Sequence, residues 1–254
     1  MRLGLGPIDL ATASRQNLRA LAEQAAASSF DAIWVAESRA ERTGGALAAA
    51  AMVGQWTPIR VGAVVDLGVY HPLHLAEDIA VADVTCAGRL ELVLRPAHDD
   101  PEVIKEHLHV LTAALAGAHI QWEGLHLRIP GRLAENGAVP QKLAVNPPPV
   151  QPLIPAWLME TAAEEWTALA DRLGFGVAWP WRRGLQLGPG RGRLPRLVLC
   201  PKFVEPVDLL AAAEEHAGYF VVDASTPDEV RTAGRRLVGA LRMPDFPDWV
   251  HAER

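Results

Sequence analysis

Two carboxylates stand where apolar runs typical of buried parallel strands come to an end. Glu37 directly follows one such run, and Asp66 closes the next. A carboxylate at the carboxyl end of a parallel strand faces the mouth of an α/β barrel, where barrel enzymes carry out their chemistry. Both residues are therefore candidate catalytic groups that could hold or move a proton. For Glu37, a structural ion pair with Arg39 or Arg60 is an equally good interpretation.

A cation and an aromatic ring stand at comparable positions further along the chain. Arg95 follows the apolar run 89–94, and its planar guanidinium fork suits a phosphate monoester. Trp179 lies near the end of the run 175–180. Its ring could form a wall beside a flat cofactor or an apolar substrate, or it could plug the barrel mouth. The pattern indicates a ligand at the strand ends, with an anionic group near Arg95.

The histidines do not form a metal-binding pattern. His71 precedes Pro72, a combination that predicts a turn and cap before a helix. His71 and His74 are spaced as two ligands on one helix face, but no third ligand lies nearby in the sequence, so we expect no metal. Glu106, His107 and His109 are expected to form a solvated, charged helix face.

Composition narrows the class of partner. Half of the 254 residues are hydrophobic, the formal net charge is −6, and no long run of Lys or Arg occurs, which argues against nucleic acid. No apolar run is long enough to cross a membrane. Cys86 and Cys200 lie far apart without metal-ligand spacing, as suits a reducing compartment. We therefore expect a cytoplasmic protein that acts on a small molecule.

Short apolar runs alternate with helical patterns, which predicts a parallel sheet with helical crossovers. The expected strands are 2–6, 31–36, 60–66, 89–94, 154–159, 175–180, 196–200 and 219–223. The expected helices are 14–29, 45–56, 73–86, 101–116, 161–173, 206–217 and 226–242. Eight such strands predict a compact (β/α)8 TIM barrel, one domain over 1–254. Residues 181–195 are too rich in Gly and Pro for a helix, so the sixth crossover helix is expected to be shortened or missing.

Three parts of the chain resemble the luciferase-like flavin monooxygenase family. The matching segments are AEQA (22–25) with FDAIWVAE (30–37), then TPIRVG (57–62), HPLHLAE (71–77) and GRLEL (88–92), and finally VQPLIP (150–155). Their order and spacing agree with the family over roughly residues 1–175, and the second group is the most specific. Beyond that point only the alternation of strands and helices is similar, and the chain is identified as a shortened and divergent member.

The resemblance implies a flavin, either FMN or the deazaflavin coenzyme F-420, over the carboxyl ends of the strands. On this basis the expected cofactor contacts are Ala36, Val64, Val65, Asp66, Arg95 and Trp179. The family also has an unusual bend at the end of the third strand, here Val64 to Asp66, where a non-proline cis peptide would mark a retained cofactor site.

Two departures from the family pattern leave the function open. Ser38 stands where the family often has a histidine, and Val93-Leu94 replace a glycine-containing strand end. One hypothesis is a monooxygenase or oxidoreductase that uses FMN or the deazaflavin. The alternative is a non-catalytic, degenerate member, which is either a flavin-binding protein or a partner protein without a cofactor. A third, unrelated barrel enzyme would use Glu37, Asp66 or Asp223 as acid and base.

An alanine-rich segment indicates an assembly. Residues 45–56 are apolar nearly all round, whereas a crossover helix on the outside of a barrel should have one polar face. A second covering surface is therefore expected, and family members also pair through early helices. We expect a homodimer, with the long connection 117–153 as the alternative cover.

Overall fold

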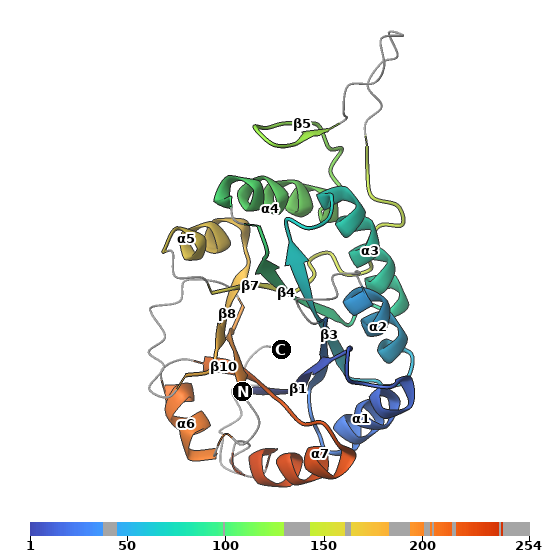
Figure 1. The fold of residues 1–254 in the computed structure, drawn as a ribbon, viewed down its shortest axis with the longest axis vertical. Coiled ribbons are helices and arrows are strands. Elements are labelled where there is room, and N and C mark those ends of the chain that lie inside the picture. Colours follow the sequence, from blue (N-terminus) through green and yellow to red (C-terminus); the bar gives the residue numbers. More distant parts are fainter. Residues whose placement is uncertain are drawn as a thin grey trace, which may run out of the picture.

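A computed structural model describes residues 1–37, 45–98, 100–129, 143–160, 164–182, 194–200, 204, 206–214, 217–238 and 240. In this part of the chain, eight parallel strands close into a barrel in the order β1-β10-β9-β8-β7-β4-β3-β2 (Figure 1). The strands are β1 (Arg2–Asp9), β2 (Ala32–Ala36), β3 (Arg60–Leu67), β4 (Leu90–Pro96), β7 (Ala156–Met159), β8 (Gly176–Pro180), β9 (Arg196–Cys200) and β10 (Ala217–Val222). The predicted TIM-barrel class and all eight predicted strands are confirmed.

Helices surround the barrel as an outer ring (Figure 1). They are α1 (Arg15–Ala27), α2 (Gly45–Gly54), α3 (Pro72–Thr85), α4 (Pro101–Leu115), α5 (Glu164–Leu173), α6 (Pro206–Glu214) and α7 (Pro227–Ala233), which continues as a π-helical turn over Gly234–Val238. Local sequence sets their starts: Ser14, Asp100 and Thr226 accept backbone N–H groups as N-caps. His71 caps α3 as predicted, through Nδ1. The segment of the predicted sixth crossover, 183–193, lies outside the described residues.

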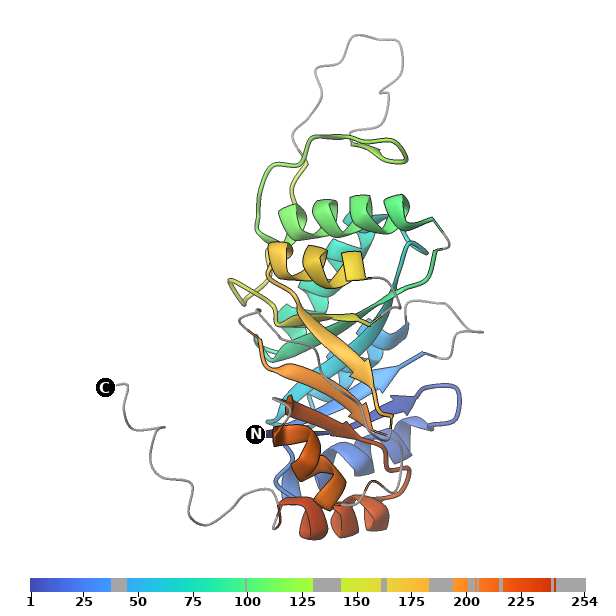
Figure 2. The ribbon, with the colours of Figure 1, turned by 90° about the vertical axis from the view of Figure 1, so that its left-hand side faces the viewer.

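The connection between α4 and β7 holds a small hairpin that the sequence did not predict. Strands β5 (Trp122–Glu123) and β6 (Arg128–Ile129) pair antiparallel beyond α4, away from the barrel (Figure 2). Glu106 on α4 holds the hairpin, because its carboxylate accepts backbone N–H groups from Leu125, His126 and Leu127. The expected solvated face is therefore wrong for Glu106 and His107, which are both buried.

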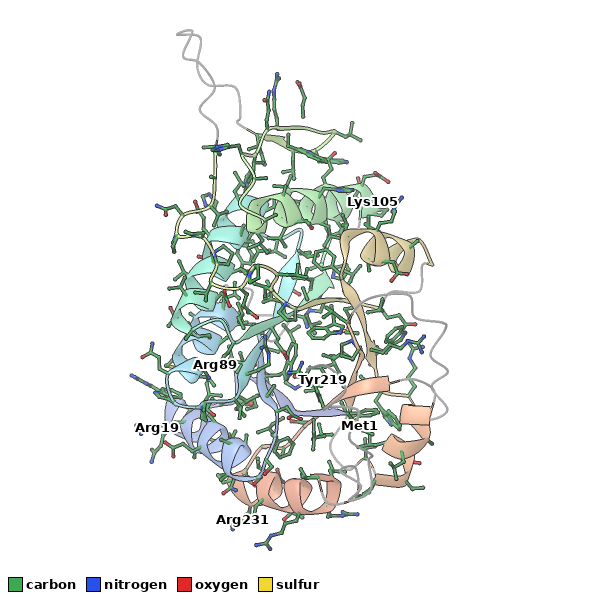
Figure 3. All side chains as sticks on the ribbon, turned by 180° about the vertical axis from the view of Figure 1, so that it is seen from behind. Met1, Arg19, Arg89, Lys105, Tyr219 and Arg231 are labelled. Atoms are coloured by element: carbon green, nitrogen blue, oxygen red, sulfur yellow. The ribbon has the colours of Figure 1, made fainter. Side chains whose placement is uncertain are left out.

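Aromatic rings and an ionic network fill the barrel lumen. Tyr219 lies within the barrel (Figure 3). Trp34 Nε1 donates to the Tyr219 hydroxyl at 2.9 Å, and that hydroxyl donates to the fully buried Glu91 at 2.8 Å. Glu91 also pairs with Arg2 at 2.8 Å and Arg60 at 2.5 Å. Since Arg2, Arg60 and Glu91 lie at or near the amino ends of their strands, they close that end of the barrel. A ligand must therefore approach from the carboxyl ends.

Trp34 fits into the lumen because the residue that faces it on strand β3, Gly62, has no side chain. A Cβ at Gly62 would overlap the Trp34 ring. Trp157 completes the aromatic layer, in edge contact with Trp34 at 6.1 Å and with Tyr219 at 5.7 Å between ring centroids. Such edge contacts add to the free energy of burying the rings. The layer forms a solid floor below the mouth of the barrel.

Candidate functional site

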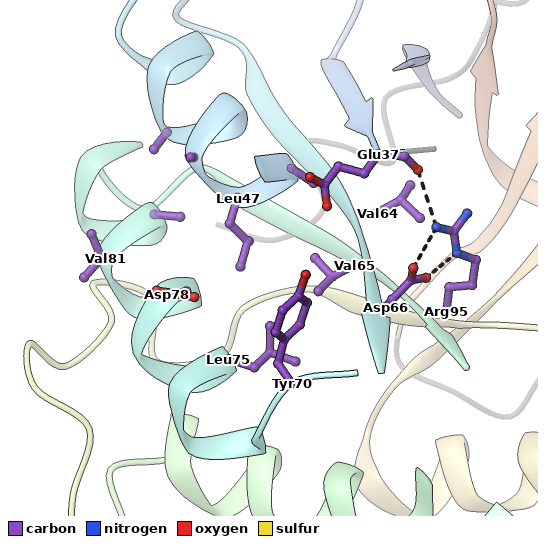
Figure 4. Close-up of a pocket in the computed structure, with 14 residues that line it drawn as sticks. Glu37, Leu47, Val64, Val65, Asp66, Tyr70, Leu75, Asp78, Val81 and Arg95 are labelled. Atoms are coloured by element: carbon purple, nitrogen blue, oxygen red, sulfur yellow. Dashed lines mark hydrogen bonds and ion pairs between the residues drawn. The ribbon is translucent and has the colours of Figure 1, made fainter. Parts of the chain in front are cut away.

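A cavity of about 230 Å³ opens where strands β2 to β4 end, beneath helices α2 and α3 (Figure 4). Its lining includes most of the residues that the sequence singled out: Glu37, Val64, Val65, Asp66 and Arg95. Alternation along a strand explains how they share one space. Val64 packs with the lumen layer, whereas Val65 packs with the layer between the strands and the helices. The cavity therefore extends from the rim of the lumen outward to the helices.

Asp66 and Arg95 form a two-point ion pair at the inner end of this cavity. Arg95 Nε lies 2.5 Å from Asp66 Oδ1, and Nη2 donates to Oδ2 at 3.1 Å (Figure 4). The pair is largely buried, with the side chains of Arg95 and Asp66 16% and 8% exposed. Sequence reasoning treated Arg95 as a cation available to a phosphate. In the structure Asp66 occupies Nε and Nη2 of Arg95, so a phosphate contact at Arg95 stays a prediction.

Glu37 is positioned by the start of a helix. Its Oε1 accepts the backbone N–H of Gly45, the first residue of α2, at 2.8 Å. A carboxylate at the start of a helix interacts favourably with the helix dipole. The predicted alternative of an ion pair with Arg60 is wrong, since Arg60 binds Glu91 at the opposite end of the barrel. Arg39 and Ser38 lie outside the described residues.

The helical wall of the cavity was not predicted as part of a site. Figure 4 shows Leu47 on α2, Leu75 and Val81 on α3, and Tyr70 just before α3 around the same space. The signal in the sequence was the helix that is apolar nearly all round. It was interpreted as a surface for a second subunit, whereas one side of it lines a cavity.

Two predicted contacts do not reach this cavity. Trp179 lies in the layer between the strands and the helices, with the Arg196 guanidinium 6.0 Å from the centre of its ring. It neither plugs the mouth nor borders the cavity. Ala36 packs against the lumen layer instead. Among the described residues, cis peptides precede only Pro7 and Pro147, so none lies at Val64 to Asp66.

A second cavity, of about 280 Å³, lies at the end of β10 beside α7. Asp223 lines it together with Asp228 and Arg236. It is similar in size to the first cavity and shares no lining residue with it. We assign the site to the first cavity, because residues from three consecutive strands converge there.

Two chemical features are absent from the described part of the chain. No group of three or more His, Cys, Asp or Glu side chains there is arranged to hold a metal ion. None of the helices described combines the length and the apolar character needed to span a bilayer. The groups that the cavity offers are Glu37 at a helix start, Asp78 on α3, the Asp66–Arg95 pair, Tyr70 and apolar walls.

Comparisons with known proteins agree with this fold. A family model described as luciferase-like monooxygenase matches residues 4–178. No curated protein matches the chain in sequence. Among solved structures, monooxygenase RslO1 from Streptomyces bottropensis superposes with a TM-score of 0.71 at 15% identity, covering 95% of this chain and 98% of that one.

Two further solved structures have the same fold. The coenzyme F-420-dependent tetrahydromethanopterin reductase from Methanopyrus kandleri gives a TM-score of 0.71 at 12% identity, over 93% of this chain and 98% of that one. EDTA monooxygenase from a Chelativorans species gives 0.61 at 14% identity, over 94% and 92%. At these identities the likeness concerns the fold.

Proposed function

The chain belongs to the luciferase-like monooxygenase family, whose model covers residues 4–178 of its 254, and we propose that it is a flavin-dependent oxidoreductase. The observation that carries the proposal is the cavity at the ends of β2, β3 and β4, with the Asp66–Arg95 pair at its inner end. In barrels of this class, the strand ends that form this cavity are where chemistry takes place.

Arg95 keeps N–H donors with which it could bind the phosphate of a flavin. Asp66 engages Nε and Nη2 of Arg95, while a guanidinium carries five N–H donors in a planar fork. A phosphate can therefore bind through the Nη1 edge while Asp66 keeps the fork in place. In this proposal Asp66 positions Arg95 and also competes with the phosphate for its charge, and Glu37 is the candidate for holding or moving a proton.

A bound flavin would supply the electron transfer, and the protein would orient it and exclude water. Both FMN and coenzyme F-420 fit the proposal. Among similar folds, one enzyme is described as F-420-dependent and a Baeyer-Villiger monooxygenase is described in complex with FMN. The substrate is a small molecule, since the cavity holds about 230 Å³.

Flavin titration tests the proposal directly. FMN, riboflavin and F-420 are added to the wild type and to Arg95→Ala, and flavin fluorescence is followed. We expect wild type to bind FMN or F-420 at tens of micromolar or below. Arg95→Ala should lose about ten- to a hundredfold in affinity, the range for a charge-assisted pair of about 1.5–3 kcal/mol. Lack of any flavin binding by wild type would favour the non-catalytic alternative.

We also propose that the protein is a cytoplasmic homodimer. Its two cysteines are buried free thiols, which suits a reducing compartment. On the outside of α2 and α3, Val81 and Val84 are 49% and 42% exposed, and Ala48 is exposed as well. A second subunit would cover this apolar face. Light scattering at micromolar concentration that gives the mass of a monomer would contradict the assembly.

A further inference from the structure

Three oxidisable rings meet inside the barrel, and the proposed function gives none of them a role. Trp34, Trp157 and Tyr219 are fully buried, and we call them the ring cluster. Their ring centroids lie 6.1, 6.0 and 5.7 Å apart, in edge contact. Indole and phenol are among the side chains that most readily lose a single electron. Rings in contact can pass that electron from one to the next.

Tyr219 is hydrogen-bonded to a group that can take its proton. Its hydroxyl donates to Glu91 at 2.8 Å and accepts the Trp34 N–H at 2.9 Å. A phenol that loses an electron becomes a strong acid and gives its proton to a hydrogen-bonded base. Arg2 reinforces this loss, because its guanidinium lies 4.3 Å from the centre of the Tyr219 ring and opposes a positive charge there. Oxidised Tyr219 is therefore a neutral radical.

Glu91 has one oxygen in place for this proton. Tyr219 donates to Oε2, whereas Arg2 and Arg60 both approach Oε1, at 2.8 and 2.5 Å. A proton can therefore pass to Oε2 while both guanidiniums stay at the other oxygen. The transfer also avoids a net positive charge on a fully buried ring, which an apolar interior disfavours.

The ring cluster lies directly below the cavity at the strand ends. Val64 lines that cavity (Figure 4) and packs in the same apolar cluster as the three rings. Val64 pairs with Ala36 on β2, and Trp34 lies two residues before Ala36, on the same face of the strand. Trp34 is therefore one lumen layer below the mouth. Tyr219 lies deeper, since it pairs with Arg2, the first residue of β1.

We propose that the ring cluster carries oxidising equivalents from the mouth of the barrel to Tyr219. The oxidant is an oxygen-derived radical of the peroxyl class, which takes one electron from Trp34 and becomes a peroxide anion. Tyr219 returns one electron to Trp34, and its proton passes to Glu91 Oε2. Trp157, in contact with both rings, offers a second path between them. The inference rests on the proposed function only for the source of the radical, and electron transfer through the rings requires no flavin.

A photo-oxidant attached at the mouth tests the proposal on the flavin-free protein. Ala48 is exposed and lines the cavity, and Cys86 and Cys200 are buried, so a thiol-reactive ruthenium polypyridyl label should attach selectively to Ala48→Cys. A flash with an external electron acceptor converts the label to a one-electron oxidant. Transient absorption should then show a tryptophanyl radical that gives way to a tyrosyl radical. Absence of the tyrosyl radical overturns the proposal.

The radical can be assigned because the chain has only two tyrosines. Tyr70→Phe is the matched control, since Tyr70 lines the cavity, and the variant leaves Tyr219 as the only tyrosine. The tyrosyl signal should persist in Tyr70→Phe and be lost in Tyr219→Phe, where the tryptophanyl signal remains. Tyr70→Phe decides the assignment even if Tyr219→Phe fails to fold. A signal that is lost in Tyr70→Phe belongs to Tyr70 and overturns the proposal.

Glu91→Gln tests the proton acceptor. The amide can accept a hydrogen bond from Tyr219 but is not basic enough to take its proton. The folded variant should keep the tryptophanyl radical and lose the tyrosyl radical. An undiminished tyrosyl yield overturns the proposal.

The position of the label provides a further control. Leu125 is 82% exposed on the hairpin that lies beyond α4, away from the barrel (Figure 2). The same label on Leu125→Cys should give no tyrosyl radical. Equal tyrosyl yields from labels at positions 48 and 125 would mean that the oxidant acts through solution, and would overturn the proposal.

The two proposals fail in distinguishable ways. Wild type that binds flavin, with no tyrosyl radical formed from the label, retains the proposed function and refutes the relay through the rings. Formation of the radical at Tyr219 in a protein that binds no flavin supports the relay and refutes the flavin enzyme.

Discussion

Asp66 and Arg95 are direct partners across β3 and β4, and both side chains turn to the same cavity. Because the strands are parallel and in register at this point, the two residues meet at the carboxyl end of the sheet without any loop between them. An ion pair built on two strands is held more rigidly than one built on loops. The cavity thus contains an arginine whose orientation is fixed before a ligand arrives.

Replacing Asp66 by Asn should change stability and ligand preference in opposite directions. The variant removes the anion from a largely buried pair, which should cost about 2–4 kcal/mol of unfolding free energy, measured in urea. The same change frees the guanidinium for a phosphate. The affinity for FMN relative to riboflavin, which lacks the phosphate, should rise about tenfold. An unchanged ratio would contradict a phosphate site at Arg95.

Replacing Glu91 by Gln should destabilise the fold without affecting the cavity. The neutral amide leaves Arg2 and Arg60 without the carboxylate they share, at a cost of about 3 kcal/mol. Tyr219→Phe should cost about 1–3 kcal/mol, because the Trp34 N–H loses its acceptor. Glu91 and Tyr219 are hydrogen-bonded to each other. The variant that carries both substitutions should therefore be less destabilised than the sum of the two single variants. Flavin affinity, measured in parallel, should stay at the wild-type level.

The strands were predictable because each is a short apolar run followed by a helical pattern, and that alternation admits few topologies. Glu37, Asp66 and Arg95 were found by the same reasoning, since a polar residue at the end of such a run faces the mouth. What the sequence did not reveal is which of them would contact one another. The Asp66–Arg95 pair depends on the register between β3 and β4, which is set by packing of the whole barrel.

Trp179 shows most clearly what could not be predicted from the sequence. Successive residues of a strand point to opposite faces, so a shift of one residue in register turns a side chain from the lumen to the helices. The run 175–180 was correctly predicted as a strand, but nothing in it fixed that parity. Glu106 was missed for a related reason, because its partners lie about twenty residues away in a hairpin that only tertiary contacts stabilise.

The hairpin β5–β6 should detach from α4 in acid. Burial opposes the charge of Glu106, but N–H donors from His126, Leu127 and Leu125 outweigh it and lower the pKa of the carboxyl below its usual value. A lowered pKa means that the charged form stabilises the fold above the ordinary carboxyl pKa of about 4.3 and that this contribution is lost as pH falls below it. Amide exchange at 125–127, corrected for intrinsic rates, should therefore quicken between about pH 5 and pH 3.

Glu106→Gln provides the control for the hairpin. The amide carries no titratable charge, so exchange at 125–127 should be faster than in wild type at pH 6 and should not change further on acidification. Trp122, which stacks on His109 with a centroid distance of 5.7 Å, reports the same event by its fluorescence. Exchange in wild type that is independent of pH would show that the carboxylate does not hold the hairpin.

His107 should make the stability of the fold depend on pH as well, at higher pH values than Glu106 does. Burial, followed by repulsion from His71 and His98, lowers the pKa of its ring to about 4. In the unfolded chain the ring titrates near pH 6.5, so between about pH 6.5 and pH 4 the unfolded state binds more protons than the folded one. Stability must therefore fall as the pH is lowered through this window. We expect a loss of about 2 kcal/mol between pH 7 and pH 4.5, measured by urea unfolding.

His107→Leu removes the titrating group, and although the variant will differ in absolute stability, its loss over the same interval should be smaller by that amount. An identical slope in wild type and His107→Leu would show that the ring is protonated in the fold as readily as in the unfolded chain.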